Sequence, residues 1–294
     1  MKSIFLPFLN KISAPFAGKG IDKKFPFLVK MHEKLYAGLQ SEGLVTVPLK
    51  IPNTSNLKLQ VEAKDTYVGM FLINTGIFEP EETKLLLSEL KSGSVVFDIG
   101  ANIGYYSIVS ASKQGISVYS FEPDKDNFEL LKSNIGLNGL TSVTPVPLAL
   151  GAQKGKIPFT VNTEHRGKSG ISADDNFDYE VDVLTLDEYC LSNNISQIDV
   201  IKLDVEGLEI DVLTGAKNTI QASPNLKLFV ELNPESLKLV NKNVNDFLSV
   251  LADLDLVPSK IIDETRSKTL DFSKEVLDEV LSHSTFTNLL CIRK

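Results

Sequence analysis

The sequence is poor in cysteine and has no long apolar run. Its two cysteines, Cys190 and Cys291, stand about a hundred positions apart, which matches no metal-binding spacing. We therefore expect two thiols in the core or in strands, and a reduced, cytoplasmic setting. No apolar stretch reaches the ~18 residues that a membrane-spanning helix requires. With 43% hydrophobic and 23% charged residues, the composition is that of an ordinary globular chain.

Positive charge is also scarce. The chain has 38 acidic residues against 30 lysines and arginines, which gives a formal net charge of −8. Proteins that bind nucleic acid in general present a basic surface to the phosphates. The charge balance therefore argues against nucleic acid as a partner.

Residues 1–34 depart from this acidic average, because they carry seven lysines against Asp22 and Glu33. These lysines are interleaved with phenylalanine and leucine. The apolar patch at 4–9 is too short for a signal peptide, and Lys11 follows it in place of a small-residue cleavage site. Two interpretations stay open. The arm packs on its own domain or on a second copy in a homo-oligomer, or it makes peripheral contact with an anionic membrane surface.

Hydrophobic patterning predicts a strand-rich start followed by alternating strands and helices. Residues 44–69 alternate polar and apolar positions and predict a β-hairpin. Pro80 opens a segment, 81–91, with helical spacing of glutamate, leucine and lysine. The regular alternation beyond residue 95 predicts an α/β fold with a mostly parallel sheet covered on both faces. Strands are expected at 95–99, 117–121, 143–148, 199–203 and 226–232, and helices at 103–113, 124–137, 185–193, 207–221 and 244–254.

Two segments interrupt or close this pattern. The glycine-punctuated residues 150–185 predict a hairpin and loop beside the sheet, and β-prone segments at 257–262 and 286–292 predict an antiparallel edge. There are no internal repeats and no low-complexity linkers. We accordingly divide the chain into an N-terminal extension, 1–65, with a helical arm and a β-hairpin, and one domain, 66–294.

The most informative stretch is a strand that turns into a glycine-spaced loop at Asp98, Gly100, Ala101, Asn102 and Gly104. Glycines lack a Cβ atom and let the backbone approach a ligand closely. A carboxylate at the start of such a loop suits a cationic ligand. S-adenosylmethionine carries an ammonium and a sulfonium, whereas the G-x-G-x-x-G pattern of nicotinamide-dinucleotide sites is absent. We predict that this loop binds S-adenosylmethionine.

A second acid follows the next predicted strand, at Glu122-Pro123. A carboxylate there can accept hydrogen bonds from both hydroxyls of an adenosine ribose, and Pro123 can pack on the adenine. Purely structural interpretations exist for each piece. Asp98 could cap the next helix, Gly104 could serve close helix–strand packing, and Glu122 could be a solvated acid at a strand end.

Further acids follow the fourth and fifth strands of the predicted sheet, at Asp204, Glu206 and Glu231. Ligands of open α/β sheets lie at the carboxyl ends of the strands, so these acids should share a crevice with the cofactor. They could hold a divalent cation such as Mg²⁺, with Asp204 and Glu231 as ligands, or one could act as a base. Alternatively, Glu206 caps helix 207–221 and Asp204 orients the methionine part of the cofactor. His165 is a further candidate base, if its loop closes over the site, or else a surface histidine.

Together these motifs resemble those of the FkbM family of S-adenosylmethionine-dependent methyltransferases, over roughly residues 65–235. The likeness lies in their order along the chain: Phe78-Glu79-Pro80-Glu81, 96–104, Phe121-Glu122-Pro123, 134–139, 184–187, 201–207 and 231–234. The resemblance implies a class I methyltransferase fold, which is Rossmann-like, with a seven-stranded sheet that contains one antiparallel strand. It also implies O-methylation of a hydroxyl on sugars, polyketides or other secondary metabolites, with a divalent cation at Asp204 and Glu231.

The sequence thus predicts an O-methyltransferase that uses S-adenosylmethionine. The acceptor is expected to be a hydroxyl of a glycan, a glycolipid or a small secondary metabolite. Two alternatives are a catalytically silent binding module of the same fold at a membrane surface, and an NAD-dependent sugar oxidoreductase.

Overall fold

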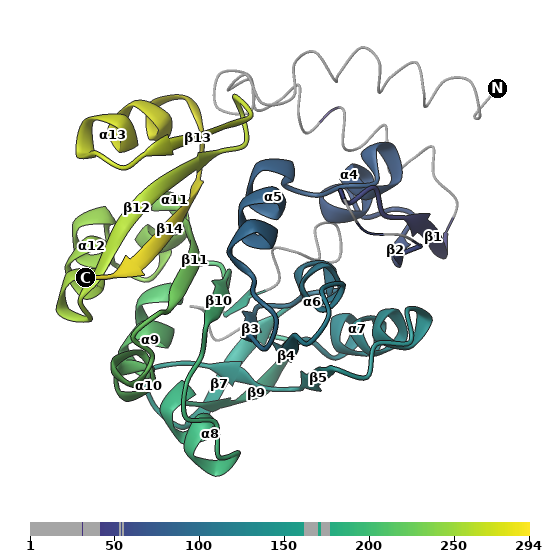
Figure 1. Ribbon diagram of the computed structural model, residues 1–294, viewed down its shortest axis with the longest axis horizontal. Coiled ribbons are helices and arrows are strands. Elements are labelled where there is room, and N and C mark those ends of the chain that lie inside the picture. Colours follow the sequence, from purple (N-terminus) through teal and green to yellow (C-terminus); the bar gives the residue numbers. More distant parts are fainter. Residues whose placement is uncertain (1–30, 32–41, 53, 55, 162–169, 172–176) are drawn as a thin grey trace.

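The computed structural model describes residues 31, 42–52, 54, 56–161, 170–171 and 177–294 (Figure 1). Its centre is a sheet of eight strands. From one edge to the other these are β13 (Lys268–Asp271), β12 (Leu256–Asp263), β14 (Thr287–Arg293), β11 (Lys227–Leu232), β10 (Val200–Leu203), β3 (Val95–Ile99), β4 (Ser117–Phe121) and β5 (Val143–Val146).

The sheet is mostly parallel, as predicted. The five neighbours from β11 to β5 run parallel to one another, while β14 is antiparallel to both of its neighbours. The edge strand β13 pairs antiparallel with β12 and brings the count to eight instead of seven. Chain order reverses between β3 and β10, so a topological switch point lies at their carboxyl ends.

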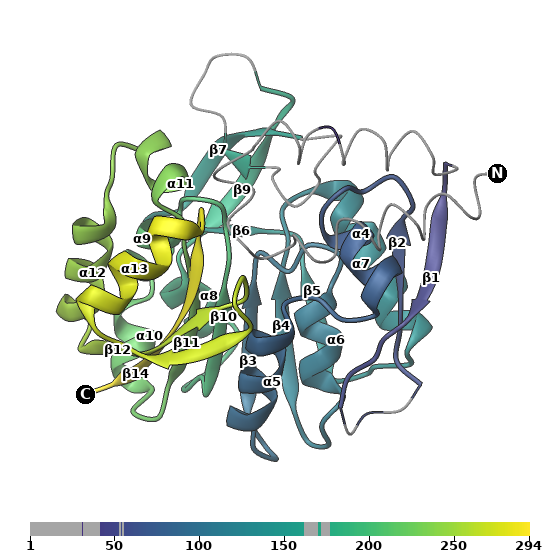
Figure 2. The same cartoon turned by 90° about the horizontal axis from the view of Figure 1, so that it is seen from above.

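Helices cover both faces of this sheet (Figures 1 and 2). Strand residues alternate in direction, so Val96 and Val118 belong to one buried cluster while Phe97 and Phe121 belong to the other. The first cluster includes residues of α4 (Val68–Thr75), α5 (Pro80–Glu89), α6 (Tyr105–Ala111) and α7 (Lys125–Leu137). The second includes residues of α8 (Leu186–Ser192), α9 (Glu209–Thr214), α10 (Lys217–Ala222), α11 (Pro234–Leu239), α12 (Val244–Asp253) and α13 (Lys274–His283).

Both cysteines lie in the core, as expected, with Cys190 3% and Cys291 0% exposed. Every helix of the described residues is too short or too polar to cross a bilayer. Most of the basic arm at 1–34 lies outside the described residues, so its membrane or oligomer contact stays a prediction.

A hairpin and a small second sheet flank the main sheet. Strands β1 (Leu44–Pro48) and β2 (Lys58–Glu62) form the predicted antiparallel hairpin, and their buried residues join the cluster of α4 to α7. The second sheet has the order β6 (Ala149–Leu150), β9 (Tyr179–Leu184), β7 (Gly155–Thr160) and β8 (Gly170–Ile171). It contains the hairpin predicted for 150–185 and stands at one end of the main sheet (Figure 2).

Two sequence predictions about helices were wrong. The hairpin predicted for 44–69 ends at residue 62, and residues 68–75 form the helix α4. The single helix predicted for 207–221 is divided into α9 and α10. The carbonyl oxygen of Gly215 accepts a hydrogen bond from the main-chain N–H of Asp187 (3.0 Å) instead of continuing the helix. The Asp187 carboxylate in turn accepts from the main-chain N–H groups of Asn218 and Thr219 and begins α10 as a separate helix.

Candidate functional site

The glycine loop after β3 is held between two neighbouring strands. The main-chain N–H groups of Gly100 and Ala101 both donate to the carbonyl of Phe121, at 3.0 and 2.9 Å. Gly100 has a φ of +84°, and a Cβ atom there would lie 1.8 Å from the carbonyl oxygen of Asp204. A side chain at this position is therefore excluded by both conformation and space. The absence of a side chain at Gly100 allows the loop after β3 to pack against the loop after β10.

Glu122 supports this loop from the end of β4. Its Oε2 accepts from the main-chain N–H of Asn102 at 2.7 Å, and its Oε1 accepts from that of Asp124 at 2.8 Å. The side chain is 5% exposed, and burial raises its pKa to about 8. Each carboxylate oxygen keeps a further lone pair for a ligand. Glu122 and Pro123 line a cavity together with Gly100.

Asp98 lies behind the loop. It is 2% exposed and is absent from the described lining of the cavity. Its Oδ2 accepts from the Ser107 hydroxyl at 2.5 Å, and burial raises the pKa of Asp98 to about 6. Gly104 is likewise outside the lining and begins α6 with a φ of +92°. Direct contact of Asp98 or Gly104 with a cofactor stays a prediction.

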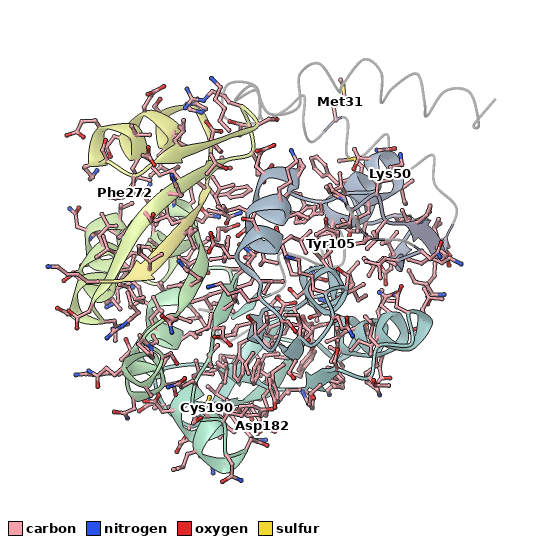
Figure 3. All side chains as sticks on the ribbon, viewed as in Figure 1. Met31, Lys50, Tyr105, Asp182, Cys190 and Phe272 are labelled. Atoms are coloured by element: carbon pink, nitrogen blue, oxygen red, sulfur yellow. The ribbon has the colours of Figure 1, made fainter. Side chains whose placement is uncertain are left out.

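The cavity extends across the switch point from the second sheet to α4. At one end it is walled by apolar side chains of the second sheet and the segment before it: Leu148, Leu150, Ile157 and Phe159. At the other end lie aromatic and acidic side chains: Tyr67, Phe78, Glu79, Tyr105, Tyr106, Asp204, Glu206 and Glu231. Figure 3 shows Tyr105 near the middle of the view. In the strand order of the main sheet, the loop Gly100–Ile103 follows β3 and Glu122 follows β4, next to β10 and β11, which carry the acids.

The three acids predicted for the reaction centre do converge. Asp204, Glu206 and Glu231 each place one carboxylate oxygen within 4.8 Å of the others. Glu231 is 7% exposed, and burial with the nearby charges of Asp204 and Glu206 raises its pKa well above the ordinary value. Its side chain makes no hydrogen bond or ion pair with any other described residue.

The loop that carries these acids has its own supports. The carboxylate of Glu209 accepts from the main-chain N–H groups of Val205 (3.1 Å) and Gly207 (3.1 Å). Glu206 has a φ of +53° and accepts from the Ser236 hydroxyl at 3.4 Å. The structure does not place Glu206 as the cap of this helix, because α9 begins at Glu209 with Leu208 in the N-cap position, and Glu206 lies beside the other acids.

A buried ion cluster next to Asp204 was not predicted from the sequence. Lys202 is 1% exposed, with its Nζ 3.3 Å from Glu82 and 3.4 Å from Asp204. The Tyr106 hydroxyl lies within hydrogen-bonding distance of the carboxylates of both Glu79 (2.6 Å) and Glu82 (2.9 Å), and its one proton can go to either. Three elements meet here, since Glu79 and Glu82 belong to the start of α5 while Lys202 belongs to β10 and Tyr106 to α6. The only signal in the sequence was the charge of Lys202 within an otherwise apolar strand.

His165 lies outside the described residues, so its role as a base stays a prediction. Tyr67, which precedes α4, is a cavity residue that the sequence interpretation did not name. It fell in the segment taken for a hairpin, where an aromatic residue is ordinary.

Comparison with known proteins identifies the family of the chain. The model of the methyltransferase FkbM domain matches residues 98–255. The hexuronic acid methyltransferase AglP of Haloferax volcanii is 30% identical over 149 residues, which are 49% of this chain and 59% of that protein. Methyltransferase 1 of Beauveria bassiana is 26% identical over 144 residues, 42% of this chain and 58% of that protein. The chain thus spans about three fifths of the length of these curated relatives.

Solved structures of methyltransferases are also similar at a lower level. A TehB-like SAM-dependent methyltransferase from Corynebacterium glutamicum is 13% identical, with a TM-score of 0.41, over 73% of this chain and 88% of that one. A precorrin-6y C5,15-methyltransferase from Geobacter metallireducens is 10% identical, with a TM-score of 0.42, over 74% and 90%. With TM-scores this low, they add nothing to the strand order described above.

Proposed function

The chain belongs to the FkbM family of methyltransferases, and from that premise we propose that it transfers a methyl group from S-adenosylmethionine to a hydroxyl oxygen. The acceptor we propose is a sugar hydroxyl, in a glycan, a glycolipid or a small metabolite. The name of the Haloferax relative, a hexuronic acid methyltransferase, supports a sugar. No feature of the described residues favours a nicotinamide cofactor or a silent binding module.

One observation carries the proposal: a glycine loop and a buried acid, Gly100 and Glu122, meet at the wall of one cavity. The residues present fit S-adenosylmethionine. Gly100 has no room for a Cβ atom, Glu122 keeps spare lone pairs for ribose hydroxyls, and the apolar side chains of the second sheet offer a slot for adenine. Bound there, the cofactor would supply an electrophilic methyl group on a sulfonium.

The protein's own part in the reaction is to bind, orient and deprotonate. We assign Gly100, Ala101, Asn102 and Glu122 to the nucleoside, with Pro123 on the adenine. The acceptor oxygen must lose its proton as the new C–O bond forms and the sulfur leaves as a neutral thioether. Glu231 suits the proton, because burial and neighbouring acids raise its pKa and make it a stronger base than an exposed glutamate.

The same acids also suit a divalent cation. Carboxylate oxygens are the ligands that Mg²⁺ prefers, and those of Asp204, Glu206 and Glu231 lie within 4.8 Å of one another. We propose Asp204 and Glu231 as its ligands. A cation held there would lower the pKa of an acceptor hydroxyl. The two roles of Glu231, base and ligand, are separable by experiment.

Calorimetric titration of S-adenosylhomocysteine into the folded protein tests the cofactor. We expect binding with one site per chain, and an absence of heat at several temperatures would defeat the proposal. Titration with MgCl₂ after EDTA treatment tests the cation in the same instrument. Methyl transfer that survives EDTA assigns Glu231 as a base, whereas transfer that stops and returns with Mg²⁺ assigns the metal.

A further inference from the structure

Two polar groups at the acidic end of the cavity have no partner in the described part of the chain. One is the carboxylate of Glu231, which is more than nine-tenths buried. The other is the hydroxyl of Tyr67, which makes no hydrogen bond to any residue that the structure describes. Both residues line the cavity. Burial, and then the nearby carboxylates of Glu79 and Glu231, raise the pKa of Tyr67 well above its ordinary value, so the phenol keeps its proton.

The Tyr67 side chain is part of an ordered aromatic wall. Its ring lies edge-on to Phe78, with centroids 5.7 Å apart, and Phe78 lies edge-on to Tyr105 at 5.9 Å. The wall is anchored at both ends. The carboxylate of Asp65 accepts from the main-chain N–H of Tyr67 at 3.0 Å, and the main-chain N–H of Phe78 donates to the Tyr105 hydroxyl at 3.1 Å. Such a wall offers a fixed apolar surface beside polar acceptors.

Acidic side chains dominate this end of the cavity. Four carboxylates line it, those of Glu79, Asp204, Glu206 and Glu231, and no lysine, arginine or histidine does so among the described residues. The nearest ammonium, Lys202, is buried and already paired. An acceptor carboxylate would therefore meet acids at this end and find no cationic side chain in the described lining to pair with. An acceptor that itself bears a carboxylate would be repelled here.

We propose that this end of the cavity is the acceptor subsite, and that it selects an uncharged sugar ring over the corresponding uronic acid. Tyr67 and Phe78 contact the C–H groups of the ring. The Tyr67 hydroxyl donates to a ring oxygen, and sugar hydroxyls donate to Glu231 and Asp204. This inference rests on the proposed function, and it separates the chain from its hexuronic acid relative by the charge of the acceptor.

Saturation-transfer NMR on the full chain tests the subsite without turnover. The protein is saturated with S-adenosylhomocysteine in EDTA, and then again in MgCl₂. The probes are methyl glucoside and methyl glucuronoside at equal concentration. We expect saturation of the ring C–H protons of the glucoside and at least tenfold less for the glucuronoside in both buffers. An equal or stronger signal from the glucuronoside would overturn the selection by charge.

Tyr67→Phe tests the named contact, because it keeps the aromatic wall and removes only the hydroxyl. The glucoside should bind about threefold to tenfold more weakly, as expected for one hydrogen bond, while the affinity for S-adenosylhomocysteine stays unchanged. Tyr119→Phe is the matched control, since Tyr119 packs on Phe97 away from the cavity lining. Identical glucoside affinity in the two variants would reject Tyr67 as a contact.

Failure of this inference is distinguishable from failure of the proposed function. Saturation of neither sugar, in a protein that binds S-adenosylhomocysteine by calorimetry, overturns the sugar subsite and leaves the methyltransferase proposal standing. A protein that binds no S-adenosylhomocysteine refutes the premise, and with it the subsite.

Discussion

Replacement of Glu122 by glutamine should weaken cofactor binding and remove its pH dependence. The carboxylate accepts a main-chain N–H at each oxygen, from Asn102 at 2.7 Å and from Asp124 at 2.8 Å. Glutamine has one acceptor oxygen in place of two. The variant therefore loses an acceptor on one side and also the charge that would strengthen hydrogen bonds from ribose hydroxyls.

The magnitude follows from the hydrogen bonds involved. A hydrogen bond to a charged group contributes about 1.5–3 kcal/mol, and about 1.4 kcal/mol is a tenfold change in affinity. Loss of one ribose contact should therefore raise the Kd for S-adenosylhomocysteine by about 10-fold to 150-fold. The exposed Glu129→Gln is the matched control, because Glu129 lies at the surface and pairs with Lys132 there. Its Kd should stay within about twofold of the parent protein.

The pH dependence gives a second signature. Burial raises the pKa of Glu122 to about 8 in the cofactor-free protein. Ribose hydroxyls stabilise the ionised form, so binding below pH 8 releases a proton and affinity rises with pH, by at most about tenfold per unit. Calorimetry at pH 6, 7 and 8, in buffers of different ionisation enthalpy, measures this release. The difference between parent and Glu122→Gln isolates it from the cofactor's own amine. Equal Kd values and equal proton release in the two proteins at every pH would refute the assignment of Glu122 to the ribose.

Three further outcomes are expected. Gly100→Ala should fail to fold or to bind S-adenosylhomocysteine, because its Cβ atom would lie 1.8 Å from a carbonyl oxygen. The control Gly136→Ala, with open space around it, should melt at or above the parent temperature. Parent-like melting and binding of Gly100→Ala would contradict the loop geometry. Lys202→Met should lower the free energy of unfolding in urea by about 3–5 kcal/mol, because it leaves buried carboxylates unpaired. The surface control Lys132→Met should lower it by under about 1 kcal/mol. Equal losses of stability would exclude a structural role for the buried cluster. Because the folded pKa of Glu122 is raised, the advantage of its neutral form is complete below about pH 4.5 and is lost as pH rises to about 8. The cofactor-free parent should therefore lose more stability between pH 5 and 8 than Glu122→Gln, and parallel urea midpoints would argue otherwise.

Local patterns in the sequence predicted most of the sheet. The strand 95–99 and the strand 117–121 were placed with the observed bounds, because apolar residues flanked by a glycine or an acid mark where a buried strand ends. Regular helices such as α7 were placed to within a residue, since Asp124 caps it by accepting from two main-chain N–H groups. The order of motifs then identified the family.

Predictions failed where a distant residue decides the local structure. Residues 207–221 have helical spacing throughout, yet Asp187 divides the helix from another part of the chain. Tyr67 read as part of a strand segment, and only the Asp65 turn at the start of α4 carries it to the cavity. Neither contact has a periodic signal.

By itself, the sequence determined which chemical groups stand at the strand ends, because each follows its own apolar run and glycine turn. Asp98 shows what it left open: the pattern does not tell how deeply the carboxylate is buried, and the structure buries it against the Ser107 hydroxyl. Only the tertiary structure could bring Asp204, Glu206 and Glu231 together and set Tyr67 and Lys202 around them. Those neighbours come from segments far apart in the chain, and their burial, which governs charge and proton affinity, exists only once the sheet and its helices are assembled.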